Sequence, residues 1–212
     1  MKPFVVLIGG SYSGCGKTTF GTRLLMTLGK NWAVIKYTKT GFYSTIVTNK
    51  DILSVEGKDT KKYLEAGACE VLWVQCPVEA LSELLSMSLE RLSNYKGIII
   101  EGNSPIEFLK PDVVVFVNGL ERPPKESAIK VKERADIVVR PDNMEEALKK
   151  TEGLINKKIL LSQELNKRAI NNRISCAIAR QIAEDLGLQY REVGEMADAL
   201  GIKITNCELG CF

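Results

Sequence analysis

The sequence predicts an α/β fold, in which helices cover both faces of a mainly parallel sheet, followed by a small, mostly helical appendage. Apolar segments of strand length alternate with amphipathic segments of helical period over most of the chain. A glycine-rich turn joins the first strand to the first helix. The 212 residues are enough for one α/β domain and a small second unit. We therefore predict domains at residues 1–156 and 157–212.

The composition excludes several classes of function. The 29 basic and 26 acidic residues are interleaved and leave a net charge of only +3, which argues against nucleic acid or a membrane as partner. The chain has no histidine, so imidazole bases and histidine-containing zinc sites are excluded. No apolar run approaches the roughly 20 residues of a membrane span, and no signal peptide is evident. With six cysteines, this predicts a reducing, cytoplasmic environment.

The first strand, turn and helix form a phosphate-binding motif. Residues 4–8 are an unbroken apolar run, typical of a parallel strand buried on both faces, and residues 20–28 have helical spacing. The turn between them contains Gly14-Cys15-Gly16-Lys17-Thr18-Thr19. Its glycines allow backbone N–H groups to turn inward around an anion, and the helix start adds its positive dipole end. This arrangement predicts a P-loop NTPase fold.

The side chains of this loop have predicted roles. Lys17 is expected to reach the β- and γ-phosphates, and the Thr18 hydroxyl to bind Mg²⁺. The consensus begins with glycine, whereas here Ser11 holds that position and Gly10 precedes it. A glycine turn that binds nothing is the alternative. We favour the phosphate loop because it lies between a buried strand and an amphipathic helix, as the motif requires.

The remaining elements follow in alternation. Strands are expected at residues 32–37, 70–76, 97–101, 112–117 and 135–139. Helices are expected at residues 61–66, 77–95 and 144–155. Residues 41–57 lack clean periodicity, so we expect a mobile loop there, beside the phosphate site.

The appendage is expected to contain two or three helices and a terminal strand at residues 202–204. Apolar residues share one face of a first helix that Gly187 ends, namely Ile174, Ile178, Ile182 and Leu186. Residues 193–200 form the next helix. The order resembles a helix-turn-helix or winged-helix unit. Its balanced charge argues against DNA binding and favours packing or dimerisation, so we expect a homodimer.

Two further positions follow from the expected sheet. Glu101 ends a buried strand at the edge where open α/β sheets bind ligands, so it is the expected acid near Mg²⁺. Asp112 begins a strand and is expected at the opposite edge. Asn118 and Glu121 follow the fifth strand, where GTP-binding proteins carry an Asn-Lys-x-Asp motif. The Glu121 carboxylate could accept hydrogen bonds from guanine, or this segment could be an exposed turn.

A resemblance narrows this prediction. The phosphate loop is followed by Val34-Ile35-Lys36, then Gly57-Lys58-Asp59-Thr60 with Ala66-Gly67-Ala68, then Ile100-Glu101-Gly102. In order and spacing, residues 3–155 resemble the MobB family of molybdopterin-guanine dinucleotide biosynthesis proteins. The resemblance implies a weak GTPase that binds GTP and Mg²⁺ and assists a molybdenum cofactor guanylyltransferase. The chain departs from the family at residues 37–39, where Tyr-Thr-Lys replaces the family's histidines.

The resemblance also adds residues to the expected site. Lys36 and Lys58 bring positive charge to a triphosphate, and Asp59 can fix a lysine or a metal-bound water. A solvated loop with an ordinary helix cap is the alternative. The expected nucleotide-binding residues are Gly14, Cys15, Gly16, Lys17, Thr18, Thr19, Lys36, Lys58, Asn118 and Glu121. The expected catalytic residues are Lys17, Asp59 and Glu101, with Thr18 and Glu101 as ligands of Mg²⁺.

The terminal cysteines suggest a second site. Cys176, Cys207 and Cys211 could converge on a metal or an iron–sulfur cluster. A fourth ligand would have to be another cysteine, a carboxylate or a group from outside the chain. Core packing is the alternative, because cysteine is often buried as a small apolar residue.

Two other functions remain open from the sequence. A small-molecule kinase could use the same loop, although Arg122 and Arg134 do not lie in an arginine-rich lid. A nucleotide-dependent metal or cluster chaperone would make use of the terminal cysteines.

Overall fold

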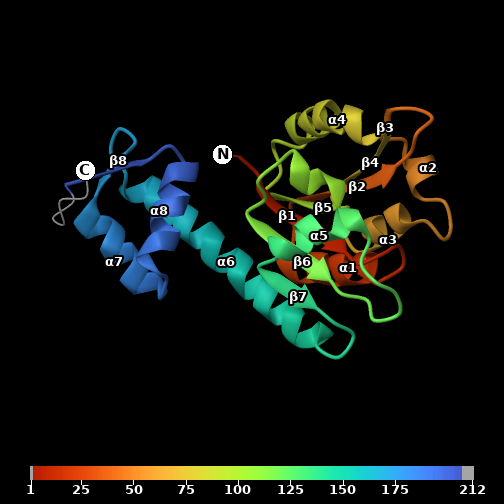
Figure 1. The fold of residues 1–212 in the computed structure, drawn as a ribbon. Coiled ribbons are helices and arrows are strands. Elements are labelled where there is room, and N and C mark those ends of the chain that lie inside the picture. The colour runs from red at the N-terminus through yellow and green to blue at the C-terminus, as the bar shows by residue number, and fades with distance from the viewer. Residues whose placement is uncertain (1, 207–212) are drawn as a thin grey trace. The chain divides into compact units, whose positions relative to one another are not determined.

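The computed structural model describes residues 2–206 (Figure 1). The chain divides into two compact units, residues 1–152 and residues 153–212. The boundary falls inside helix α6 (Met144–Arg168). The expected end of this helix at residue 155 is wrong, because helical periodicity and helix-forming residues continue to its end.

The first unit is built on a seven-stranded sheet with the order β3-β4-β2-β5-β1-β6-β7. All neighbouring strands are parallel except β3 and β4. The strands are β1 (Phe4–Gly10), β2 (Trp32–Lys39), β3 (Thr45–Val47), β4 (Glu70–Cys76), β5 (Gly97–Glu101), β6 (Val113–Val117) and β7 (Ile137–Val139). The prediction of an α/β fold with a mainly parallel sheet is confirmed.

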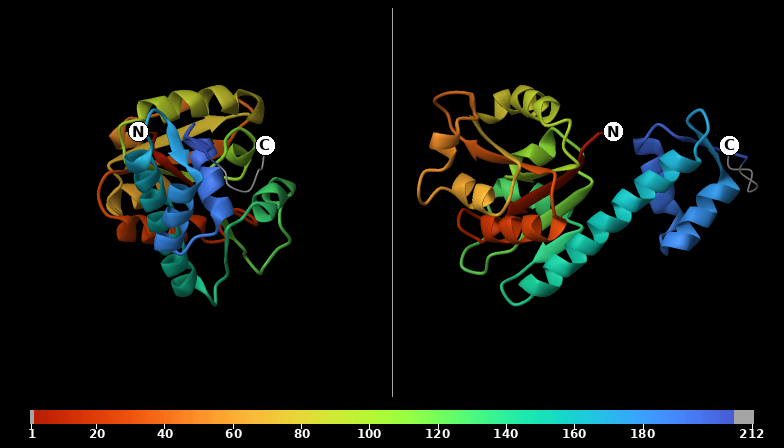
Figure 2. Two further views of the ribbon diagram at one scale, coloured as in Figure 1. Left: turned by 90° about the vertical axis from the view of Figure 1, so that its left-hand side faces the viewer. Right: turned by 180° about the vertical axis from the view of Figure 1, so that it is seen from behind.

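Helices cover both faces of this sheet (Figures 1 and 2). The helices of the first unit are α1 (Lys17–Leu28), α2 (Lys50–Leu53), α3 (Asp59–Glu65), α4 (Val78–Arg91) and α5 (Glu126–Glu133), with a 3₁₀ turn at Ser104–Glu107 and the start of α6. Leu81 of α4 and Val131 of α5 pack in one core with Leu7 and Ile35 of the sheet. Helices α1 and α3 lie on the other face and contact each other.

The segment between β2 and α3 corrects one prediction. Residues 41–57 contain strand β3 and helix α2 instead of the expected structureless loop. Strand β3 pairs antiparallel with the edge strand β4, and it has only three residues. A segment this short repeats no hydrophobic period, so the periodicity that predicts longer elements is absent here.

The second unit has its own core. It contains the end of α6, β8 (Arg173–Ser175), α7 (Cys176–Leu186), α8 (Tyr190–Ala199) and β9 (Lys203–Thr205). Strands β8 and β9 pair in parallel, and Gly187 ends α7 in the left-handed conformation. Ile174 lies in β8, before the helix in which we expected it, because the Ser175 side chain caps α7. Ile202 and Ile182 are both buried in this core.

Among residues 2–206, none of the helices combines the length and the apolar character that a membrane span requires.

Candidate functional site

The chain between β1 and α1 forms a tight loop whose glycines are required by its conformation. Gly14 and Gly16 have positive φ angles of 88° and 99°, a region that side chains with a Cβ rarely adopt. At Gly10, a Cβ would lie 2.5 Å from Cys15 Sγ and 2.9 Å from the carbonyl oxygen of Val117. The loop can therefore curl over the end of β1 only with glycine at these positions.

Two polar side chains fix the loop to neighbouring strands. The Gly10 N–H donates to Asn103 Oδ1 at 2.8 Å, and Asn103 Nδ2 donates to the Gly10 carbonyl at 3.0 Å. The Ser11 hydroxyl donates to Asn118 Oδ1 at 3.1 Å and accepts from the Gly119 N–H at 3.2 Å. Ser11, where the consensus has glycine, is thus a buried tether between the loop and the end of β6.

Lys17, the first residue of α1, turns back over the loop. Its Nζ donates to the carbonyl oxygen of Tyr12 at 2.8 Å and lies 3.7 Å from Cys15 Sγ. Within residues 2–206, no carboxylate forms an ion pair with this ammonium. Its positive charge therefore lies beside the backbone carbonyl of Tyr12, within the loop.

Glu101 is the buried centre of the site. It ends β5, and the sheet register places it beside Ile8 of β1 and Lys36 of β2. Its side chain is only 1% exposed. The Thr18 hydroxyl lies 3.1 and 3.0 Å from its two oxygens, the Tyr63 hydroxyl donates to Oε2 at 2.9 Å, and Lys36 Nζ contacts Oε1. These donors offset the cost of burying the carboxylate.

The ion-pair network continues from Lys36 to Asp59. Lys36 Nζ lies 2.9 Å from Asp59 Oδ2, and Lys62 Nζ lies 3.2 Å from Asp59 Oδ1. Burial alone would lower the pKa of Lys36, but Glu101 and Asp59 more than offset this and raise it. Burial would raise the pKa of Asp59, but its hydrogen bond with Lys36 lowers it. Both groups are therefore charged near neutral pH.

Tyr63 reaches Glu101 because α1 lacks a side chain where the two helices meet. A Cβ at Gly21 would lie 2.1 Å from Tyr63 Oη. Burial and the nearby Glu101 raise the pKa of Tyr63 well above its ordinary value, so the phenol stays protonated and donates. Sequence reasoning missed Tyr63, Gly21 and Asn103, since none belongs to a motif. Only the tertiary fold brings Asn103 to the loop, and Tyr63 past Gly21 to Glu101.

A large cavity of about 980 Å³ opens over this edge of the sheet. Its walls include residues 12–14 and 16–19 of the loop, but not the predicted Cys15, together with Lys36, Asp59 and Glu101. Lysines contribute positive charge around it: Lys17, Lys36, Lys39, Lys62, Lys125 and Lys130. Such a cavity, with polar groups converging at one end, is the usual form of a small-molecule site.

Other predicted residues lie elsewhere. Lys58 Nζ lies 4.7 Å from the centre of the Trp73 ring, in a smaller neighbouring pocket. The Asn118 side chain is bonded to Ser11, and the Glu121 N–H donates to Tyr12 Oη at 3.1 Å. The Glu121 side chain is exposed. Neither Asn118 nor Glu121 lines the large cavity.

The cysteine hypothesis remains a prediction. Cys207 and Cys211 lie outside the described residues, while Cys176 begins α7. Within residues 2–206, no group of three or more cysteine, aspartate or glutamate side chains is arranged to hold a metal ion.

The fold and this site define an α/β protein that gathers polar and charged side chains at the carboxyl edge of a parallel sheet. Compared with known proteins, the chain matches no family model and no curated protein.

Proposed function

We propose that this chain is a P-loop protein that binds GTP together with Mg²⁺. The observation that carries the proposal is the hydrogen bond between Thr18, at the start of α1, and buried Glu101, at the end of the adjacent parallel strand β5. P-loop NTPases hold Mg²⁺ with a loop serine or threonine and an acid at the end of a strand. Hydroxyl and carboxylate oxygens are ligands that suit Mg²⁺, so these residues fit the ion.

Different groups of the chain would bind the phosphates and the metal ion. The loop's backbone N–H groups and Lys17 would hold the β- and γ-phosphates, while Thr18 and Glu101 would hold the metal. Bound Mg²⁺ would neutralise phosphate charge. Lys36 pairs with both Glu101 and Asp59. If Lys36 turned to a phosphate oxygen, Lys62 would still pair with Asp59.

For the biological role, we propose a GTP-binding accessory protein of molybdenum or tungsten cofactor maturation. It would act with a guanylyltransferase and hydrolyse GTP slowly. Support comes from the resemblance to MobB proteins, since Lys36, Asp59 and Glu101, which help carry that resemblance, meet in one network beside the loop.

The test is nucleotide binding by calorimetry with GTP and ATP in the presence of Mg²⁺. Lys17→Ala should abolish measurable binding, because a cation that faces phosphate oxygens is lost while the fold keeps its core. Lys30→Ala removes an exposed lysine just beyond α1 and should bind as the parent does. Unchanged affinity in Lys17→Ala would remove the phosphate-loop proposal, and tighter ATP binding would remove the preference for GTP.

A small-molecule kinase is the second candidate, favoured by the size of the cavity. The cavity extends past the loop to Ser127 and Lys130, which leaves room for an acceptor beside the nucleotide. Against it, the cavity walls contain lysines but no arginine among the described residues. Arg134 donates to the Ile106 carbonyl, and Arg122 stacks on Tyr12. Phosphoryl transfer to a small-molecule acceptor, followed by mass spectrometry, would distinguish the two.

A further inference from the structure

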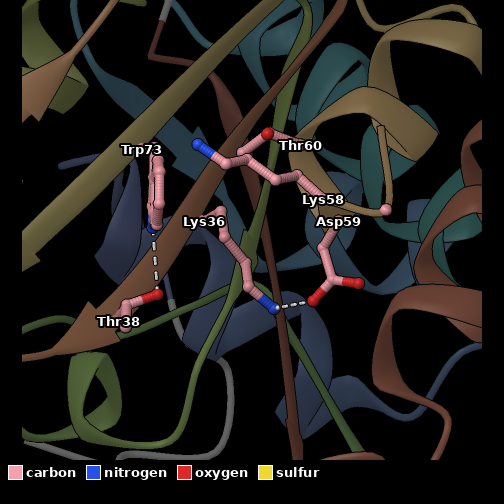
Figure 3. Close-up of a pocket in the computed structure, with 7 residues that line it drawn as sticks. Lys36, Thr38, Lys58, Asp59, Thr60 and Trp73 are labelled. Carbon is pink, nitrogen blue, oxygen red and sulfur yellow. Dashed lines mark hydrogen bonds and ion pairs between the residues drawn. The ribbon is translucent and has the colours of Figure 1, made fainter. Parts of the chain in front are cut away.

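A second, smaller pocket of about 220 Å³ adjoins the large cavity (Figure 3). Lys36 and Thr38 of β2, Trp73 of β4 and the segment from Gly57 to Thr60 form its walls. The sheet register pairs Lys36 with Trp73, so the pocket lies over the junction of β2 and β4. Lys36, Thr38 and Asp59 belong to both cavities, whereas Lys58 and Trp73 line only the smaller one.

Among the described residues, Lys58 is a cation without an acidic partner. In Figure 3 its side chain extends towards Trp73, whereas Lys36 Nζ turns towards Asp59. Lys58 Nζ lies over the Trp73 ring and 3.4 Å from the carbonyl oxygen of Ile52. In the described part of the chain, no carboxylate lies within ion-pair distance of it. The half-buried ammonium thus has donors to spare.

The hydrogen bonds of the other walls leave a second spare donor in the pocket. Trp73 Nε1 donates to Thr38 Oγ1 at 3.0 Å, which leaves the Thr38 hydroxyl hydrogen to donate. Asp59 already accepts from Lys36 and Lys62. The Thr60 hydroxyl donates to the Leu53 carbonyl at 2.7 Å. The pocket therefore has spare donors at Lys58 and Thr38 beside an aromatic ring, while Lys36 and Lys62 balance the charge of Asp59 in its wall.

We propose that this pocket is a binding site for an oxyanion of the phosphate type, separate from the phosphate loop. Lys58 and Thr38 bind the anion, and Trp73 forms the adjacent wall. The anion is either free inorganic phosphate or the phosphate group of a small organic ligand whose apolar part contacts the Trp73 ring. The pocket is smaller than typical drug-sized sites, so the organic ligand is small.

Anion binding in this pocket can be measured by the fluorescence emission of Trp73. The chain has two tryptophans, and the other, Trp32, is only 1% exposed, so an anion in the pocket changes mainly the emission of Trp73. Titrations with inorganic phosphate and with phenyl phosphate are made in full-length Lys17→Ala protein, at ionic strength held constant with chloride. The Lys17→Ala background weakens binding at the loop, so the site is tested independently of the nucleotide proposal.

We expect a saturable change in emission that disappears in the additional variant Trp73→Phe. Adding Lys58→Ala should weaken phosphate binding by about tenfold, because a charged hydrogen bond is lost. Adding Lys61→Ala is the matched control, since Lys61 pairs with Glu56 and lies outside the pocket, and it should leave the affinity unchanged. Equal affinities for the two ligands indicate free phosphate, and tighter binding of phenyl phosphate indicates an organic ligand.

Three results would overturn the proposal. The first is an emission change that grows linearly without saturating. The second is Lys58→Ala protein that has the parent's unfolding temperature and binds phosphate as tightly as the parent. The third is a saturable signal that occurs only when Lys17 is present, which would assign the anion to the phosphate loop. Failure of the parent protein, with Lys17 present, to bind GTP while the Trp73 response to phosphate is intact would refute the nucleotide proposal alone.

Discussion

At the scale of single residues, the site depends on how the buried Glu101 side chain is held inside the protein. Three side chains from three different elements contact it: Thr18 of α1, Lys36 of β2 and Tyr63 of α3. Removal of one partner from a buried charge costs more than the same loss at the surface, because the charge stays desolvated. Each member of the network can therefore be tested by a substitution that keeps its shape.

Glu101→Gln keeps the size of the side chain and removes its charge. We expect GTP binding to be largely retained, while the Mg²⁺ affinity falls by about tenfold and any hydrolysis slows, since the proposed metal ligand becomes neutral. Calorimetry with and without Mg²⁺ and a phosphate-release assay measure these effects. Hydrolysis at the parent rate would transfer the metal-side role to another acid, with Asp59 the next candidate.

Tyr63→Phe keeps the packing of the ring and removes one donor to Glu101. We expect the free energy of unfolding to fall by about 1.5–3 kcal/mol, the range for a hydrogen bond to a charged group. Urea unfolding measures the change. Tyr43→Phe is the control, because Tyr43 is 51% exposed and should be neutral. Equal stability of Tyr63→Phe and the parent would mean that water replaces the phenol without cost.

At the scale of elements, buried parallel strands are what the sequence predicts best. Strands β4 and β5 have the expected bounds, since strands covered on both faces are continuous apolar runs. Strand β3 was missed because it has three residues and its pairing with β4 is tertiary information. The site residues also fall into those that the sequence predicts and those that it does not. Lys17, Thr18 and Glu101 are predicted from a motif or from the end of a strand. Tyr63 and Asn103 reach the site only through the tertiary fold.

Two glycines inside helices should respond oppositely to alanine. A Cβ at Gly21 of α1 would overlap Tyr63 Oη, so Gly21→Ala should lower the free energy of unfolding by about 1–3 kcal/mol. A Cβ at Gly153 of α6 has open space, so Gly153→Ala should raise it by up to about 1 kcal/mol. Chemical denaturation compares both with the parent. A stabilising Gly21→Ala would mean that α3 can shift and that Tyr63 is not held by α1.

At the scale of the whole molecule, each unit has a separate hydrophobic core. In the first unit the sheet packs with α4 and α5 on one face and buries side chains of α1 and α3 on the other, and in the second unit α7, α8 and the end of α6 form a core. The sequence analysis places the boundary between residues 156 and 157, and the structure divides the chain between residues 152 and 153, inside helix α6, whose helical period continues unchanged. All residues of the proposed nucleotide site lie in the first unit.

GTP with Mg²⁺ should therefore stabilise the first unit directly. Trp32 and Trp73 both belong to this unit, so tryptophan emission during unfolding reports on it. At a free GTP concentration of about 100 times Kd, the free energy of unfolding should rise by about 2.7 kcal/mol, since the ligand binds only the folded form. Lys17→Ala should show no rise at the same concentration, and Lys30→Ala should show the full rise. An equal rise in Lys17→Ala would indicate that GTP binds outside the loop, away from the groups that Thr18 and Glu101 bring together.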